Sequence, residues 1–292
     1  MTRGVGGPEF AAGLSDPVAI GVALVTALGD AWFVFCLLGA LYWFGPALPG
    51  PMSLSRRVAA FGIALALGGL AATTTLKELF RLPRPPGAAD PAAAALVPEM
   101  LLPLYAEIGA SDGFGFPSGH AVTAIVVYGG LALVIDSRRG YAAAAVLCVA
   151  IPLSRVALGV HYFVDIVAGA ALGVAYLGAV YRYCRRGTDP ASAMAIAVVV
   201  AIGSVAVGNT ADTLLALGGS LGGLVGWLLF GGVIDETPAT PAGGLLAAIL
   251  GLALGGLFAA STVFDPLPLI EGLAMSLVVV GVFASPVAAE AA

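Results

Sequence analysis

Charged residues are scarce in this chain. They make up 10% of its 292 residues, whereas 60% of the residues are hydrophobic and the mean hydropathy is +1.04. Soluble domains carry about 25% charged residues, so a soluble globular domain is excluded, and the apolar content also excludes intrinsic disorder. Twelve basic against 17 acidic residues give a net charge of −5, which disfavours nucleic-acid binding, and three cysteines are too few for a disulfide scaffold. The composition therefore predicts a multi-pass protein of the lipid bilayer.

Long apolar stretches fill most of the chain. A membrane-spanning helix needs about 20 mainly apolar residues, and strand-like alternation is missing from these stretches. The expected fold is therefore all-α, a polytopic transmembrane helix bundle of about nine spans. The stretches are Val18–Phe44, Val58–Leu76, Gly119–Ile135, Tyr141–Gly159, His161–Tyr181, Ala191–Gly208, Thr213–Phe230, Gly243–Phe264 and Leu267–Ser285.

The first apolar stretch is longer than one span and contains Asp30. It forms either one tilted helix or, as we favour, an interfacial helix followed by a short span from about Asp30. We interpret Asp30 as an interfacial helix cap, with a buried polar contact as the alternative.

Basic residues orient the spans. Seven arginines fall in loops that alternate spans place on one face, which the positive-inside rule assigns to the cytoplasm. They are Arg56, Arg57, Arg138, Arg139, Arg182, Arg185 and Arg186. We divide the chain into a transmembrane core over residues 1–189 and accessory transmembrane helices of unknown role over residues 190–292, which contain no His, Lys or Arg.

The chain's single lysine, both of its histidines and three further arginines (Arg81, Arg84 and Arg155) fall at the opposite face. Rare ionisable residues at one membrane depth indicate a functional site. Lys77, Arg84 and Arg155 bring three positive charges, and Ser118 and Gly119 begin a helix whose free N–H groups point to the same region, with Ser118 as its N-cap. This combination predicts an anion site, with phosphate as the natural ligand.

The two histidines suggest phosphoryl transfer. His161 and Asp165 are spaced i, i+4, so the carboxylate can fix the tautomer of a nucleophilic imidazole. His120 stands beside a helix N-terminus and suits a general acid that protonates the leaving oxygen. Positive side chains would stabilise the transferred group where other enzymes use Mg²⁺, so no metal and no cofactor are expected.

Three linked motifs carry a family resemblance. They are Lys77-x6-Arg84-Pro85, Pro117-Ser118-Gly119-His120 and Ser154-Arg155-x5-His161-x3-Asp165. This set resembles the signatures of the type 2 phosphatidic acid phosphatase family, which shares its site with vanadium-dependent haloperoxidases. The resemblance implies that His161 is the nucleophile, Asp165 its partner and His120 the acid, whereas Lys77, Arg84, Ser118, Gly119 and Arg155 hold the phosphoryl oxygens.

The expected function is a metal-independent lipid phosphate or diphosphate phosphatase of the cell membrane, with its site on the extracytoplasmic side. Its substrate would be an isoprenoid diphosphate or a phosphatidate-like lipid. A lipid phosphotransferase and a non-enzymatic transport or scaffold protein are the alternatives, and the sequence leaves the oligomeric state open.

Two further features concern packing and access. Gly218, Gly222 and Gly226 follow a spacing that permits close approach of helices. The Pro-rich segment from Glu78 to Phe116 is long for a loop, and we expect it to shape the substrate entrance.

Overall fold

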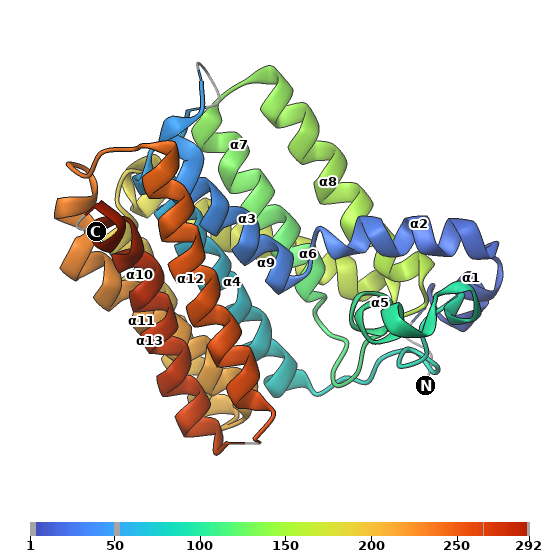
Figure 1. Ribbon diagram of the computed structural model, residues 1–292. Helices are drawn as coiled ribbons and strands as arrows, with labels where there is room; N and C mark the ends of the chain where they lie inside the picture. Colours follow the sequence, from blue (N-terminus) through green and yellow to red (C-terminus); the bar gives the residue numbers. More distant parts are fainter. Residues whose placement is uncertain (1–3, 50–52, 265, 291–292) are drawn as a thin grey trace. The chain divides into compact units, whose positions relative to one another are not determined.

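The computed structural model describes residues 4–49, 53–264 and 266–290, and within these ranges it is helical without strands (Figure 1). Among the described residues, seven helices are long and apolar enough to cross a membrane. They are α4 (Arg56–Phe80), α8 (Arg138–Ala157), α9 (Phe163–Tyr183), α10 (Pro190–Val207), α11 (Ala211–Ile234), α12 (Pro241–Thr262) and α13 (Pro268–Glu290). The expected all-α, multi-pass class is confirmed.

Two further apolar segments are broken. The helices α2 (Asp16–Ala27) and α3 (Ala31–Phe44), the latter continued by a 3₁₀ turn to Ala47, form a pair bent by 50°. The run Gly119–Ile135 consists of α6 (Gly119–Thr123), a π-helical segment η5 (Ala124–Gly129) and α7 (Gly130–Ile135). The first apolar stretch is therefore two helices that meet at Asp30, and the total lies close to the nine spans expected.

Helix starts follow local sequence signals. Thr210 and Thr213 form a reciprocal capping box at the start of α11, and the side chains of Ser137, Asp189 and Thr240 accept backbone hydrogen bonds at the starts of α8, α10 and α12. Proline occupies the first turn of α10 and α12, where its missing N–H costs nothing. The starting residues of these spans are therefore fixed by caps, although the spans have no charged face.

The chain divides into two compact units that do not follow chain order. Unit 1 comprises residues 1–34 and 76–178, and unit 2 comprises residues 35–75 and 179–292. The helices α3, α4 and α9 each contribute residues to both units.

In unit 1, α2 packs against α8 and against the short helix α5 (Leu102–Gly109), as Figure 1 shows. Their shared core joins Ala23 and Ala27 of α2 to Tyr105 and Ile108 of α5, together with Val160 beyond the end of α8. The long segment between α4 and α6 is thus an ordered layer on these helices, with Met100 and Leu104 exposed at its surface.

In unit 2, α11 and α13 pack closely. A side chain at Gly218 would collide with the backbone of Gly272, and one at Gly222 with the backbone of Ser276. A Cβ at Gly226 would lie 3.0 Å from the Phe283 ring. The glycine spacing that the sequence contains is therefore a helix-packing face.

One end of unit 2 is tied by arginines. Arg56 donates hydrogen bonds to the carbonyls of Thr237 (2.8 Å) and Pro238 (3.1 Å), beyond the end of α11. Arg57 pairs with Asp235 and its guanidinium lies 5.4 Å from the centre of the Trp227 ring. These contacts fix the α11–α12 connection to the start of α4.

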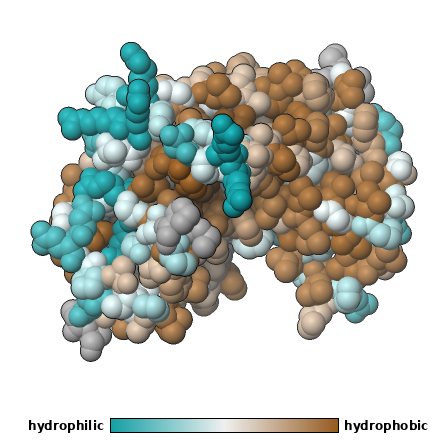
Figure 2. Space-filling view, turned by 90° about the horizontal axis from the view of Figure 1, so that it is seen from above, coloured by the Kyte–Doolittle hydropathy of each residue, from teal (hydrophilic) through white to brown (hydrophobic). Residues whose placement is uncertain are grey.

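Much of the surface seen in Figure 2 is hydrophobic. Large apolar side chains on the long helices are more than half exposed, among them Val146, Val174, Leu228, Leu257 and Leu277. Apolar side chains in these positions match lipid surroundings and not water.

Candidate active site

His161 and Asp165 lie together at the start of α9, inside unit 1. His161 occupies the connection between α8 and α9, and its Nδ1 lies 3.3 Å from Oδ2 of Asp165. The same Oδ2 accepts the backbone N–H of Tyr162 at 3.0 Å. Both side chains are almost fully buried, so the carboxylate at Nδ1 holds the imidazole in a fixed orientation.

The second ring nitrogen of His161 faces Arg84. Nη1 of Arg84 lies 2.8 Å from Nε2 of His161, and the same guanidinium donates to the carbonyls of Asp112 (2.6 Å) and Val160 (3.2 Å). With Nδ1–H directed at Asp165, Nε2 presents its lone pair to this cation. That lone pair is the one a nucleophilic imidazole uses.

Burial lowers the pKa of His161 well below its ordinary value of 6.5, and the positive charges of Arg84, Arg155 and Lys77 lower it further. Burial also lowers the pKa of Arg84 to about 10, against the opposing influence of Asp112 and Asp165. His161 is therefore neutral at neutral pH, and Arg84 is charged.

Arg155 is 2% exposed and belongs to the last turn of α8. Its Nη1 donates to Oγ1 of Thr26 (3.2 Å) and to the carbonyl of Ile108 (3.1 Å), and its Nη2 donates to the hydroxyl of Ser111. The guanidinium thereby joins α2, α5 and the segment that carries Arg84, while its Nε has no hydrogen-bond partner among the described residues.

Ser118 and Gly119 begin α6, and the turn that contains them lies against α9. The N–H of Ser118 donates to the carbonyl of Asp165 at 3.0 Å. A Cβ at Gly169, one turn further along α9, would lie 2.5 Å from the carbonyl oxygen of Ser118, so this approach requires glycine. The motifs around His120 and His161 are thus joined through the backbone.

The expected capping bond of Ser118 is absent. Ser118 stands at the N-cap position with extended backbone, but its side chain makes no cap hydrogen bond. Its Oγ is fully buried and without a partner among the described residues. Because a buried hydroxyl without a partner is unfavourable, this atom is suited to contact a ligand.

His120 has a carboxylate partner that the sequence does not reveal. Oδ1 of Asp30 lies 2.8 Å from Nε2 of His120, and both side chains are largely buried. Asp30 is thus a buried polar contact, which was the alternative interpretation, and not merely an interfacial cap. The two residues are 90 positions apart in the chain, so no helical spacing could have paired them.

Lys77 ends the set. It lies in the last turn of α4, and its charge is close enough to lower the pKa of His161. All eight residues expected from the three motifs therefore belong to unit 1, on α4, α6, α8, α9 and the connections next to them. Within the described residues, no group of three or more His, Cys, Asp or Glu side chains is arranged to hold a metal ion.

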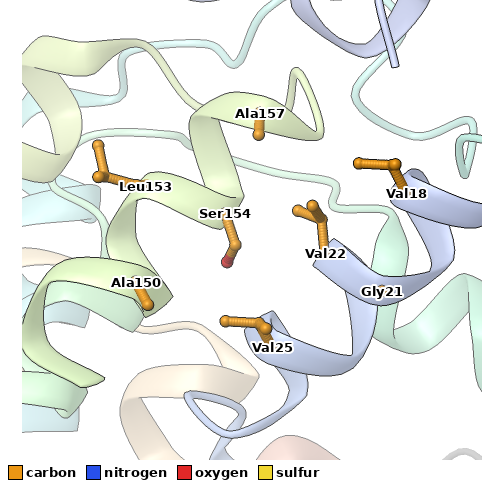
Figure 3. Close-up of a pocket in the computed structure, with 8 residues that line it drawn as sticks. All are labelled: Val18, Gly21, Val22, Val25, Ala150, Leu153, Ser154 and Ala157. Atoms are coloured by element: carbon orange, nitrogen blue, oxygen red, sulfur yellow. The ribbon is translucent and has the colours of Figure 1, made fainter. Parts of the chain in front are cut away.

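Cavities formed by described residues lie in the same unit, and two of them adjoin the helices of the site. One, of about 410 Å³, is polar and lined by Arg84, Ser111 and Asp112 together with α5. The other, of about 450 Å³, is an apolar groove between α2 and α8, shown in Figure 3. Its walls are Val18, Gly21, Val22 and Val25 on α2, and Ala150, Leu153, Ser154 and Ala157 on α8.

The family resemblance is confirmed for the part of the chain that carries the motifs. Residues 57–189, a little under half of the chain, match the family model described as the PAP2 superfamily. These residues include every motif position and exclude Asp30.

A curated relative is phosphatidylglycerophosphatase B from Bacillus subtilis (strain 168). The two sequences are 33% identical over 85 residues, which cover 26% of this chain and 42% of the relative. The chain thus spans less than half the length of this relative in the match. No solved structure matches the chain significantly.

Proposed function

We propose that this protein is a membrane lipid phosphate phosphatase that works through a phosphohistidine intermediate and without a metal. The observation that carries the proposal is the state of His161. Its ring is buried, neutral and oriented by Asp165, and its free nitrogen faces the cations of a site suited to phosphate.

The proposed reaction has two steps. In the first, Nε2 of His161 attacks phosphorus, the ester P–O bond breaks, and His120 gives a proton to the leaving oxygen. In the second, water attacks the phosphohistidine while His120 takes up its proton, and the P–N bond breaks to release inorganic phosphate. Arg84 moves from Nε2 to a phosphoryl oxygen when substrate binds, because a dianion is a stronger acceptor than a neutral imidazole.

The phosphoryl oxygens are proposed to bind groups of five residues. Lys77, Arg84 and Arg155 supply charge, and Gly119 supplies a backbone N–H at the start of α6, since the N–H of Ser118 is bound to the carbonyl of Asp165. The hydroxyl of Ser118 adds a donor, since it has no protein partner among the described residues. Fixed donors of this kind stabilise the charge of the transition state.

The substrate is proposed to be a lipid whose tail stays in the bilayer. The apolar groove between α2 and α8 supports this, because the helix pair that forms it also holds Arg155 through Thr26. The similarity to phosphatidylglycerophosphatase B favours a phosphatidate-like lipid, and an isoprenoid diphosphate remains an alternative substrate. We also propose that the site faces the extracytoplasmic side of the cell membrane, since seven arginines lie at helix ends or in loops that alternating spans would place on the other face.

Phosphate release by the detergent-purified protein tests the proposal. Excess EDTA is present throughout, and the substrates are a phosphatidate, a phosphatidylglycerophosphate and an isoprenoid diphosphate. We expect release that is insensitive to EDTA and lost in His161→Ala. Release that persists in folded His161→Ala would refute the nucleophile.

A phosphotransferase with the same site would leave the phosphoryl group on His161. It is distinguished by adding an alcohol acceptor to a preparation that releases little phosphate. Transfer to the acceptor would favour this alternative, whereas absence of any turnover and of any phosphohistidine would favour a transport or scaffold role.

A further inference from the structure

The bend between α2 and α3 docks onto the site at three points, all within unit 1. Thr26 accepts a hydrogen bond from Arg155, the carbonyl of Leu28 accepts one from the hydroxyl of Tyr128, and Asp30 reaches His120. The bend therefore contacts two of the three motif elements. It lies outside residues 57–189, so the family match does not assign it a role.

The close approach of the bend depends on Gly29. A Cβ at this position would lie 2.5 Å from Cγ2 of Ile151 and 2.9 Å from Cδ2 of His120. The absence of a side chain lets the backbone at Gly29 approach the imidazole ring closely. The next residue, Asp30, can then direct its carboxylate to Nε2 of the same ring.

We propose that Asp30 is a positioning residue that keeps the proton of the general acid on His120. This inference rests on the proposed function. Burial and the nearby cations disfavour the imidazolium form of His120, and a carboxylate 2.8 Å from Nε2 opposes them and fixes the ring, so that the other ring nitrogen carries the proton that the leaving oxygen receives.

The proton that His120 gives in the first step is regained in the second. In the first step the Nδ1–H bond of the His120 imidazolium breaks and an O–H bond forms on the leaving alcohol, while Asp30 stays ionised beside Nε2–H. In the second step the neutral Nδ1 takes a proton from the attacking water. Asp30 itself neither gives nor receives a proton.

The chemistry of the leaving group separates this role from a structural one. An alkoxide leaving group needs protonation, whereas p-nitrophenolate leaves readily without it. A residue that serves the general acid therefore matters for an alkyl phosphate and little for p-nitrophenyl phosphate. A residue that only holds the fold matters equally for both.

The experiment compares Asp30→Asn with wild type on dioctanoyl phosphatidate and on p-nitrophenyl phosphate. We expect kcat on the phosphatidate to fall about 10- to 100-fold and kcat on p-nitrophenyl phosphate to change by less than about threefold. Inhibition by vanadate, a phosphate mimic, should stay unchanged, because Asp30 does not contact the phosphoryl oxygens. Asp16→Asn, the same change at the start of α2, is the matched control.

A double variant closes the test. In a His120→Ala background, Asp30→Asn should cost no more than about twofold on the phosphatidate, since the group it serves is gone. If Asp30→Asn does not fold, Asp30→Glu keeps the charge and should lower only the phosphatidate rate. Equal losses on both substrates, or a full additional loss in the His120→Ala background, would overturn the proposal.

Failure of the proposed function has a different signature. It would appear as hydrolysis that survives His161→Ala on both substrates, or as a wild-type protein without phosphatase activity. Failure of the role of Asp30 appears in a protein whose activity depends on His161 and whose preference between the two substrates does not change.

Discussion

At the scale of the residue, the site combines buried charge with a buried neutral base. His161 is surrounded by three cations and paired with one carboxylate, and it stays neutral because protonation would add a further charge to an enclosed space. A nucleophilic imidazole must be neutral, so the same features that bind phosphate also prepare the nucleophile.

The stability of the protein should depend on pH through His161. Its pKa in the folded state lies below the ordinary 6.5, so only the unfolded chain takes up this proton as the pH falls through 6.5. Stability is therefore complete above pH 6.5 and declines below it, by about 1.4 kcal/mol from this group at about pH 5.5. Thermal unfolding in detergent at several pH values should show a steeper acid-side loss for wild type than for His161→Asn. Parallel curves would show that the burial of His161 is not what resists protonation.

Ser118 should contribute to binding and not to stability. Its hydroxyl has no partner to lose among the described residues, so Ser118→Ala should leave the unfolding temperature within error. A hydrogen bond to a charged oxygen contributes about 1.5–3 kcal/mol, so vanadate affinity should fall about 10- to 100-fold. Ser220→Ala removes an equally buried hydroxyl in unit 2 that also has no partner in the described part of the chain, and is the matched control. Equal vanadate affinity in the two variants would contradict the assignment.

The motif residues could be predicted because the residues of each motif lie only a few positions apart in the sequence. His161 and Asp165 are four positions apart, and Nδ1 of His161 lies 3.3 Å from Oδ2 of Asp165, although His161 precedes the first residue of α9 and the two do not share one helix face. Asp30 could not be predicted as the partner of His120, because the contact depends on how a bend in one helix meets the start of another. An acidic residue in an apolar stretch was the available signal, but it does not name a partner.

At the scale of the element, the position of the turn that begins α6 depends on the small residue that α9 has opposite it, Gly169. Gly169→Ala would place a methyl group 2.5 Å from the carbonyl of Ser118 and 2.9 Å from Cβ of Ala121, so the turn at Ser118 must move. We expect activity to fall about tenfold or more, because a displacement of about 1 Å in a positioned group is costly. Gly178→Ala, on the same helix with open space around it, should be silent. Phosphate release per folded protein measures both, and full activity in Gly169→Ala would show that the turn tolerates the shift.

The groove between α2 and α8 should discriminate lipids from soluble esters. Gly21 lines it and has open space where a side chain would begin, so Gly21→Leu fills the groove without a clash. We expect severalfold lower activity on a long-chain phosphatidate and unchanged activity on p-nitrophenyl phosphate, since only a tail would occupy the groove. A parallel loss on both substrates would argue against tail binding in this groove.

At the scale of the whole molecule, unit 2 depends on close helix packing. Gly222→Leu would force α11 away from Ser276 of α13 and should destabilise the protein by about 1–3 kcal/mol, as overpacking usually does. Gly232→Leu on the same helix points into open space and should be neutral. Thermal unfolding in detergent compares the two. Equal unfolding temperatures would show that the α11–α13 contact adjusts without cost.

The spans were predictable, but their division into units was not. Span length and hydropathy follow from composition alone, whereas the units divide α3, α4 and α9 within single helices. No linker, composition change or charge run marks Val34, Thr75 or Gly178 in the sequence. Such boundaries arise from side-chain packing, which cannot be predicted from the order of apolar residues alone.

The π-helical segment from Ala124 to Gly129 has a consequence for comparing relatives. A residue of α-helix turns the chain by about 100°, so a π-helical stretch changes the rotational phase of everything that follows it. Tyr128 lies inside this stretch and donates a hydrogen bond to the carbonyl of Leu28, so its direction relative to the start of α6 depends on the wider π-helical turn. Relatives with an unbroken α-helix after their Ser-Gly-His motif should therefore align with a one-residue gap here, and should hold the preceding helix bend by a different contact.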